Sequence, residues 1–435
     1  MIIVDTALKK RLAAGNPVRV VLVAAGYMGR GIVLEIVRAF PGLRLVAIAN
    51  RTVDQAERAY REAGISEVRS VATAAELDRA IADGAYAVTD DPEVVCKADR
   101  VECVIETSGD VEFGSRVALD AVRNGKHVVL MNAEVDAAVG PILKVYADRN
   151  DVVYTYTDGD EPGVAMNLFR FVDSIGYKPV MLGQIKGFLN RYRNPETQRE
   201  FAAKHKQKPA MVASFADGSK LALESAMMGN ATGFKPAKVG MWGHECKHVK
   251  DLLTLFKPDD FARGGIVDFV LGAEPHTGAF VMGYNDNPVL RQYMAYFKFG
   301  DGPLYMFYTP YHLPHLQLPH SVARAVLFND PTLTPLGAPV CEAVAYAKRD
   351  LKSGETLDGM GGFTNYGMID TYANSEANNY LPMSLSIDCK LKRDIAKDQP
   401  LRYTDVALPA GRVCDQLRAE QTAHFKTRGR EAASA

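Results

Sequence analysis

The sequence predicts an α/β fold, and three observations support that prediction. In the first third of the chain, apolar runs rich in Val and Ile alternate with segments of helical period, which is typical of strands buried on both faces of a parallel sheet. A glycine-rich turn joins the first such run to the helix that follows it. Near the C-terminus, a charged motif occurs twice. The 435 residues are enough for two or three domains, at about 150 residues each.

Composition and charge exclude several classes of protein. The 51 Lys and Arg against 52 Asp and Glu give a formal net charge of −1, so no excess charge attracts nucleic acid or anionic lipid. No apolar run approaches the roughly 18 residues of a membrane helix, and the first residues lack a signal-peptide pattern. The six cysteines form no CxxC pair and are expected to be reduced thiols. We therefore expect a cytoplasmic protein with no nucleic-acid and no membrane partner.

The first strand–turn–helix unit carries the clearest signal in the sequence. Two apolar runs, Val18–Ala24 and Leu43–Ala49, flank a helical stretch over residues 30–40, and the turn matches GxGxxG except at the first glycine. In that motif the backbone approaches a pyrophosphate, and the helix N-terminus favours phosphate charge. The alternative is a tight turn whose glycines serve only the backbone geometry. We predict a Rossmann domain whose dinucleotide contacts are Ala24, Gly26, Tyr27, Met28 and Gly29.

The end of the second strand indicates which dinucleotide is bound. Asn50, Arg51 and Thr52 stand there, where an NAD site usually places a carboxylate that binds the ribose 2′-hydroxyl. A guanidinium pairs bidentately with a 2′-phosphate, and the neighbouring amide and hydroxyl complete the contacts. The sequence therefore favours NADP over NAD as the cofactor. The alternative is a solvated arginine on a loop.

Two later apolar runs, residues 100–105 and 127–131, end in small polar residues. The carboxyl ends of parallel strands form the edge at which open α/β sheets bind ligands. We expect a further strand at residues 152–155 and an insertion of helices over residues 53–84. The polar residues predicted to lie near the nicotinamide half of the cofactor are Thr107, Ser108, Gly109 and Asn132.

Several motifs resemble a known superfamily. The segments AAGYMG, ETSG and GKHVVLMNAE resemble the cofactor domain of homoserine dehydrogenases, while TDGDEPG (157–163), FADGSK (215–220), NATG (230–233) and PYHL (310–313) are similar to the deoxyxylulose phosphate reductoisomerase-like group within that superfamily. The resemblance covers nearly the whole chain and implies an oxidoreductase. Homoserine dehydrogenases carry a lysine where this chain has Ala133, so a homoserine substrate is not expected. In the reductoisomerase-like group, a lysine- and asparagine-rich segment follows a strand like Val180–Ile185.

Reduction of a carbonyl requires a proton donor and a group that stabilises the alkoxide. Lys186 follows the predicted strand 180–185 and is the candidate proton donor. Asp160 and Glu161 follow another apolar run and either hold a divalent cation or cap the helix that starts near Pro162. His312 is the candidate for an acid–base relay. The four candidate catalytic residues are therefore Lys186, Asp160, Glu161 and His312.

The segment after Lys186 is a candidate site for a substrate anion. Arg191 and Arg193 alternate around Tyr192, so in extended backbone both would face one way and bind a phosphate or carboxylate. Asn190 is the remaining candidate for substrate binding, while the alternative is a solvated loop. Further on, residues 211–216, a turn at 217–218 and residues 220–223 suggest a β-hairpin, in a mostly antiparallel sheet.

Two further motifs in the second half of the chain contain none of the candidate catalytic residues. Residues 244–248 fit HExxH, but the preceding glycines favour a polar helix start over a zinc site. The motif KRD followed by an apolar residue occurs at Lys348–Leu351 and again at Lys392–Ile395. Two copies suggest duplicated short β elements with turns, and the pattern resembles the SAF domain, a small β fold. For the individual residues, the alternative is plain surface turns with exposed charge.

These inferences combine into one expected organisation. We predict an NADP-binding Rossmann domain (1–155), an α+β catalytic and oligomerisation domain (156–335), a SAF-like β domain (336–410) and a C-terminal helix and tail (411–435). The expected function is NAD(P)H-dependent reduction of a carbonyl in a small anionic, sugar-derived substrate by a homodimer or homotetramer. The alternatives are reductoisomerase-like activity on deoxyxylulose phosphate and a catalytically degraded protein that senses NADP(H).

Overall fold

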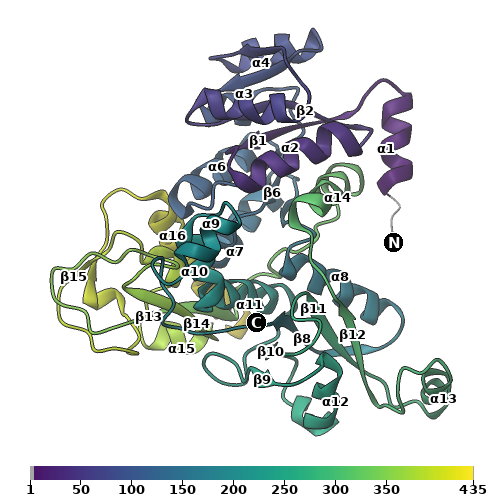
Figure 1. The fold of residues 1–435 in the computed structure, drawn as a ribbon, viewed down its shortest axis with the longest axis vertical. Coiled ribbons are helices and arrows are strands. Elements are labelled where there is room, and N and C mark those ends of the chain that lie inside the picture. The colour runs from purple at the N-terminus through teal and green to yellow at the C-terminus, as the bar shows by residue number, and fades with distance from the viewer. Residues whose placement is uncertain (1–3, 435) are drawn as a thin grey trace. The chain divides into compact units, whose positions relative to one another are not determined.

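The computed structural model describes residues 4–434, which form two compact units (Figure 1). The first unit comprises the described residues up to Asp160, Leu313–Gly337 and the residues from Arg412 onward. The second unit comprises Glu161–His312 and Ala338–Gly411. Within the described residues, no helix combines the length and the apolar character needed to cross a membrane.

The first unit is built on a parallel sheet of seven strands in the order β3-β4-β2-β1-β5-β6-β7. Its central strand β1 buries every residue except Arg19, which is half-buried, as expected of a strand covered by helices on both faces. This sheet confirms the predicted Rossmann-type α/β fold. The strands are β1 Val18–Val23, β2 Leu43–Ala49, β3 Val68–Ser70, β4 Tyr86–Thr89, β5 Cys103–Glu106, β6 His127–Leu130 and β7 Tyr154–Tyr156.

Helices cover the two faces of this sheet. Helix α14, from a segment distant in sequence, packs against α2, where Leu318 and Val322 join the core around Ile32 and Ile36. The predicted helical insertion over residues 53–84 contains α3 and α4 but also the edge strand β3, which is too short to show a strand period. The helices are α1 Val4–Ala13, α2 Tyr27–Ala39, α3 Val53–Glu62, α4 Ala74–Ala82, α5 Pro92–Lys97, α6 Val111–Arg123, α7 Ala133–Arg149, α14 Pro314–Phe328 and α16 Val413–Ser434.

The second unit contains a five-stranded sheet in the order β12-β11-β8-β10-β9. Strand β10 pairs in parallel with β8 and β9, whereas β11 pairs antiparallel with β8 and β12. The sheet is therefore mixed, and the expectation of a mostly antiparallel sheet is wrong. Helices α8 (Glu161–Ser174) and α11 (Ser219–Thr232) pack on it. The strands are β8 Lys178–Lys186, β9 His244–Glu245, β10 Ile266–Leu271, β11 Ala279–Tyr284 and β12 Leu304–Thr309.

The predicted hairpin over residues 211–223 is wrong. Helix α10 (Pro209–Ala216) and helix α11 occupy this segment, joined by Gly218 in the left-handed conformation (φ 83°). A short apolar run does not by itself distinguish a buried strand from a buried helix. The correction matters for function because Lys220 and Glu224 are now one helical turn apart and lie on the same face of α11.

The HExxH segment forms the predicted helix start only at its last residue. His244 and Glu245 lie in β9, and His248 caps a short 3₁₀ turn, Val249–Asp251, that leads into α12 (Leu252–Leu255). The two histidines are therefore not one helical turn apart, as a zinc-binding helix requires. Among the side chains that the structure describes, those of residues 4–427, no group of three or more His, Cys, Asp or Glu is arranged to hold a metal ion.

The duplicated segment, residues 338–411, belongs to the second unit. It contains two small antiparallel pairs, β13 with β14 and β15 with β16. Its elements are β13 Cys341–Ala347, β14 Asn365–Thr371, α15 Tyr372–Ala377, β15 Lys390–Leu391 and β16 Val406–Ala407. The other helices of the unit are α9 Arg199–Lys204 and α13 Pro288–Tyr296.

Candidate active site

The glycine turn after β1 has the geometry that a dinucleotide site needs. Ala24, in place of the first glycine of the motif, takes a positive φ of 76°. Gly29 lies so close to the preceding turn that a Cβ added there would approach the Ala24 carbonyl oxygen to 2.4 Å. The third glycine of the motif is therefore required for packing, as predicted, while the strain of the first position is carried by an alanine.

Two predicted cofactor residues support this turn from neighbouring strands. The side-chain oxygen of Asn50 accepts a hydrogen bond from the Ala25 N–H (2.9 Å), and the Thr107 hydroxyl donates to the Ala24 carbonyl (2.7 Å). Both side chains thus fix the path of the backbone between β1 and α2.

The N-terminus of α2 fits a pyrophosphate. Gly26 precedes the helix in extended conformation, no side chain caps the first N–H groups, and the first turn holds no acidic residue. A Cβ added at Gly26 would meet no protein atom within 4 Å, so the space above this backbone is open. Unpaired N–H groups and the positive end of the helix dipole favour phosphate there. Tyr27 and Met28 form the first turn of the same helix.

Arg51 and Thr52 are both exposed at the end of β2. In the described part of the chain, Arg51 makes no ion pair, so its guanidinium is available to an anion. Thr52 is the residue before α3 and does not cap it with its side chain.

The edge formed by β5 and β6 contains a residue that the sequence analysis missed. The fully buried Glu106 accepts hydrogen bonds from the Ser108 N–H and from the side-chain amide of Asn132 (both 2.8 Å). Burial raises the pKa of Glu106 to about 7, and its bonds to Ser108 and Asn132 oppose that rise. A carboxylate at the end of an otherwise apolar strand was the signal for it. Glu106 thereby fixes two of the predicted cofactor-site residues, Ser108 and Asn132. Gly109 takes the left-handed conformation in the turn between β5 and α6.

Three of the four predicted catalytic residues lie together in the second unit. Glu161 begins α8 and forms an ion pair with Lys186, the last residue of β8. The Nδ1 atom of His312 lies 3.8 Å from Glu161 and 3.0 Å from the Thr277 hydroxyl. The Glu161 side chain is 6% exposed and that of Lys186 is 20% exposed. The lysine therefore reaches solvent or a ligand from one side, while its partner is enclosed.

A second lysine–carboxylate pair lies on the same side of β8, and sequence reasoning missed it. Glu224 is buried on α11, 4.0 Å from the ammonium of Lys220, and accepts a hydrogen bond from the amide of Gln184 (2.9 Å). Gln184 and Lys186 are two residues apart on β8, so their side chains point to the same face. The missed signal was the FADGSK motif, in which Lys220 was assigned to a strand.

Asp160 has different surroundings from Glu161. It belongs to the first unit, and its carboxylate accepts a hydrogen bond of 2.5 Å from the Tyr156 hydroxyl. The two adjacent carboxylates thus have different partners. The divalent cation considered for them from the sequence stays a prediction.

The substrate segment forms a turn instead of the extended strand expected for it. The Arg193 N–H bonds the Asn190 carbonyl (3.1 Å), and the Tyr192 N–H bonds the Asn190 side chain (3.1 Å). The two arginines therefore do not face one way: Arg191 lies over the Tyr366 ring and Arg193 over the Phe188 ring. Neither guanidinium has a carboxylate partner within the described residues, and the Nε of Arg193 is buried without a hydrogen bond.

Comparison with known families identifies the class of this second unit. Residues 159–318 match the family described as "Oxidoreductase DRL, catalytic domain". The match covers somewhat more than a third of the chain and includes Glu161, Lys186 and His312. It confirms the predicted resemblance to oxidoreductases and the predicted class of enzyme, an oxidoreductase.

Solved structures resemble the chain more weakly. A probable dehydrogenase from Thermotoga maritima is 12% identical, with 74% of this chain and 91% of that chain covered and a TM-score of 0.42. A homoserine dehydrogenase from Thiobacillus denitrificans is 14% identical, with 89% and 98% covered and a TM-score of 0.42. A DOX-P reductoisomerase crystallised with fosmidomycin and magnesium is 14% identical, with 72% and 70% covered and a TM-score of 0.38. At these TM-scores the three carry no argument about function. No curated protein matches the sequence.

Proposed function

We propose that this chain, whose residues 159–318 match an oxidoreductase catalytic domain, uses NADPH to reduce a carbonyl group of a small anionic substrate. The observation that carries the proposal is the Glu161–Lys186 pair with His312 beside it. A buried carboxylate that holds a partly exposed lysine is suited to a reaction in which the lysine meets a developing negative charge.

The choice of NADPH rests on the end of β2. Arg51 is exposed and without an ion pair among the described residues, and no carboxylate follows β2 to bind a ribose hydroxyl. A guanidinium in this position favours a 2′-phosphate. The open backbone at Gly26 and the uncapped start of α2 would hold the pyrophosphate.

The chemistry assigns a role to each residue of the cluster. When bound, the nicotinamide supplies a hydride to the carbonyl carbon. The electron pair of the C=O bond then moves to oxygen, which takes a proton from Lys186, so that the carbonyl becomes an alcohol. Glu161 holds the lysine and keeps it charged, and His312 replaces the proton from solvent. Lys220 and Glu224, on the same side of β8, position the substrate oxygen.

The anionic character of the substrate rests on Arg191 and Arg193. Both guanidinium groups lack a carboxylate partner within the described residues, and although they lie over different rings, each is able to bind phosphate or carboxylate. A small sugar-derived phosphate or acid satisfies both requirements, a carbonyl and an anion.

The proposal is tested by mixing the protein and NADPH with each compound of a panel of carbonyls and following the oxidation of NADPH by its absorbance. The panel contains carbonyls with a phosphate or carboxylate group and their neutral analogues. We expect oxidation of NADPH with anionic members of the panel and much slower oxidation with their neutral analogues. A protein that binds NADPH but oxidises it with no carbonyl would be a sensor and not a reductase. Equal rates of oxidation with neutral and anionic carbonyls would contradict the proposal that Arg191 and Arg193 bind an anionic group of the substrate.

A further inference from the structure

The duplicated segment pairs its two motif copies with each other. Leu351 and Ile395, at equivalent positions, exchange backbone hydrogen bonds of 2.8 and 3.0 Å. The Asp350 side chain accepts from the Lys397 N–H, and Asp394, its equivalent, accepts from the Ser353 N–H (both 2.8 Å). Ser353 and Lys397 are themselves equivalent. These backbone and aspartate contacts therefore form a local twofold arrangement, whereas the ion pair of Lys352 with Asp394 has no counterpart at Ala396.

The two copies also differ at the first and the seventh position of the motif. The first lysine of the motif is buried in one copy, Lys348, and exposed in the other, Lys392. The seventh position is Gly354 in the first copy and Asp398 in the second. Lys348 of one copy and Asp398 of the other each contact residues outside the two motif copies, which the pairing of the copies does not by itself require.

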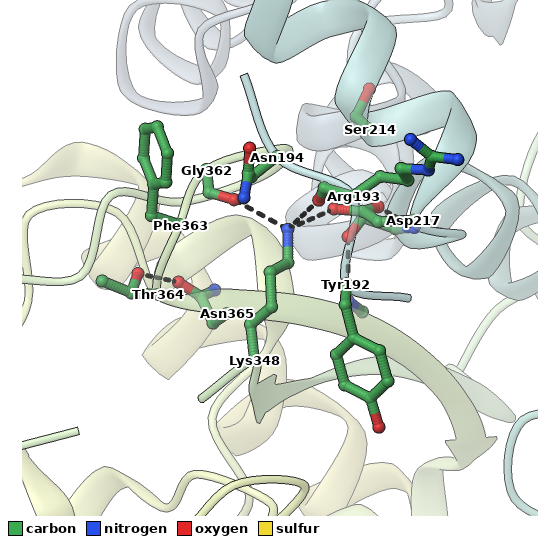
Figure 2. Close-up of polar contacts among 12 residues, drawn as sticks. Tyr192, Arg193, Asn194, Ser214, Asp217, Lys348, Gly362, Phe363, Thr364 and Asn365 are labelled. Carbon is green, nitrogen blue, oxygen red and sulfur yellow. Dashed lines mark hydrogen bonds and ion pairs between the residues drawn. The ribbon is translucent and has the colours of Figure 1, made fainter. Parts of the chain in front are cut away.

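Lys348 uses its ammonium group to hold three separate parts of the second unit (Figure 2). It donates to the Asp217 carboxylate (2.8 Å), to the Arg193 carbonyl (2.8 Å) and to the Gly362 carbonyl (2.7 Å). These three bonds use all the hydrogen-bond donors of a lysine ammonium. The Asp217 side chain is fully buried and that of Lys348 is 4% exposed, so water does not compete for these bonds.

Asp398 holds the same turn from the other motif copy. Its two carboxylate oxygens accept hydrogen bonds from the hydroxyl groups of Tyr192 (2.9 Å) and Tyr366 (3.0 Å). The Tyr366 ring in turn lies beneath the guanidinium of Arg191, 5.9 Å from its centre. Three successive residues, Arg191, Tyr192 and Arg193, are thus each held from the duplicated segment.

We propose that Lys348 and Asp398 are positioning residues, which fix the turn Asn190–Asn194 so that Arg191 and Arg193 present their charges to the substrate anion. Recognition of the substrate would then depend on the duplicated segment, although neither residue touches the substrate. The proposal rests on the proposed function for its claim about substrate, but its structural claim is tested without any substrate.

Hydrogen–deuterium exchange of the full-length chain tests the structural claim. The amides of Asn190, Tyr192, Arg193 and Asn194 all donate hydrogen bonds within the second unit, so their exchange reports the order of the turn. We expect Lys348→Met and Asp398→Ala each to accelerate exchange in peptides over residues 188–199 by about tenfold. Lys392→Met, at the equivalent but exposed lysine, is the matched control and should leave this exchange unchanged.

Asp398→Ala tests the same claim in case Lys348→Met does not fold. Lys348→Met leaves the buried Asp217 without its partner and can destabilise the whole unit, whereas Asp398 is exposed and its removal buries no charge. Faster exchange confined to residues 188–199 in Asp398→Ala supports the proposal. Unchanged exchange of the turn in Asp398→Ala, or in a folded Lys348→Met, overturns it.

Kinetics then separate this proposal from the proposed function. With an anionic carbonyl that oxidises NADPH, Asp398→Ala should raise KM about tenfold and change kcat by less than about threefold, because it acts on ground-state binding of the anion. Faster exchange of residues 188–199 together with an unchanged KM in Asp398→Ala would show that the order of the turn does not affect substrate binding, and would overturn that part of the proposal. If Arg191→Ala and Arg193→Ala also leave KM unchanged, the substrate site itself lies elsewhere, whatever the exchange result.

Discussion

Buried carboxyl groups with neutral partners in the first unit contrast with three lysine–carboxylate pairs in the second unit. In the first unit, buried Glu106 and Asp136 are bonded to neutral partners, Ser108 and Asn132 for the glutamate and Tyr154 for the aspartate. Burial raises the pKa of both carboxyls to about 7. In the second unit, three buried carboxylates face lysines, in the pairs Glu161–Lys186, Glu224–Lys220 and Asp217–Lys348, whereas the buried Asp268 accepts hydrogen bonds from backbone N–H groups.

The difference follows from what each unit does in the proposed reaction. A site for a dinucleotide binds with backbone N–H groups and needs neutral supports, because a buried negative charge nearby would repel phosphate. A site for carbonyl reduction needs a proton and positive charge, and a buried lysine keeps its proton only beside a carboxylate. Among the second unit's carboxyls, burial also raises the pKa of Asp217, while Lys348 opposes that rise.

The largest expected effect is on Lys186. Lys186→Met should lower kcat by about 10²–10⁴-fold, the usual contribution of a proton donor, with little change in the affinity for NADPH. Lys178→Met, at the exposed opposite end of β8, is the matched control. Steady-state kinetics and NADPH titration measure both effects. A wild-type kcat in Lys186→Met would show that Lys186 does not donate the proton, and would contradict the assignment of the catalytic step to the second unit.

The next effect concerns the neutral surroundings of Asp136. Its pKa is raised from 3.8 to about 7 by burial, so the folded state binds its proton more tightly than the unfolded state. Its contribution to stability is full below about pH 4 and is lost as the pH rises through about 7. Asp136→Asn, which removes this titration, should therefore gain up to about 4 kcal/mol over the wild type between pH 4 and pH 8.

Denaturant unfolding at several pH values measures this gain. Asp151→Asn, at an exposed position, is the control, and its difference from the wild type should stay constant with pH. A constant difference for Asp136→Asn as well would mean that burial does not raise the pKa of this carboxyl, and would remove the account of its neutral surroundings.

A pair of glycine variants sharpens the account of the cofactor turn. Gly29→Ala places a Cβ against the Ala24 carbonyl and should destabilise the protein without cofactor by about 2–3 kcal/mol. Gly26→Ala meets no protein atom and should leave that stability unchanged while it weakens NADPH binding. Thermal unfolding with and without NADPH distinguishes the two. Equal NADPH binding in Gly26→Ala and the wild type would place the pyrophosphate elsewhere.

The smallest effect is expected at Arg51. Because this side chain is exposed, the loss of its bond to the 2′-phosphate in Arg51→Asp should weaken NADPH binding by about tenfold and improve NADH binding. Titration with both cofactors measures the ratio. Thr52→Ala, next to it, is the control, with a smaller change in that ratio. An unchanged ratio in Arg51→Asp would contradict the preference for NADPH.

The same comparison shows what the sequence could predict. The strands β1, β2 and β6 are confirmed nearly residue by residue, because a parallel sheet between helices leaves a local signature of apolar runs. Strand β5 is confirmed in place, but it begins three residues later than the predicted run 100–105. The glycine turn was predictable for the same reason, since Ala24, Gly26 and Gly29 act through backbone geometry within six residues. The prediction of a hairpin for residues 211–223 was wrong because a short apolar run fits a helix as well as a strand.

The site of the second unit was predictable only in part. Lys186, Glu161 and His312 stand out by their neighbours in sequence, but their contacts join α8, β8 and the segment after β12, which no local pattern reveals. Lys220 and Glu224 became visible only as neighbours on a helix. The role of Lys348 depends on a bond to a carbonyl 155 residues away, and its sequence motif is shared by the exposed Lys392.

Chemical rescue tests the central claim, that Lys186 supplies the proton, most directly. In Lys186→Ala, the single-turnover rate of NADPH oxidation by a saturating anionic carbonyl is measured against the concentration of added methylammonium. If the lysine ammonium donates the proton, the small amine should enter the space that the side chain leaves and raise the rate at least about tenfold. The wild type and Lys178→Ala should show no such dependence. A Lys186→Ala rate that equals the wild-type rate, or that stays low at every amine concentration, would contradict the claim.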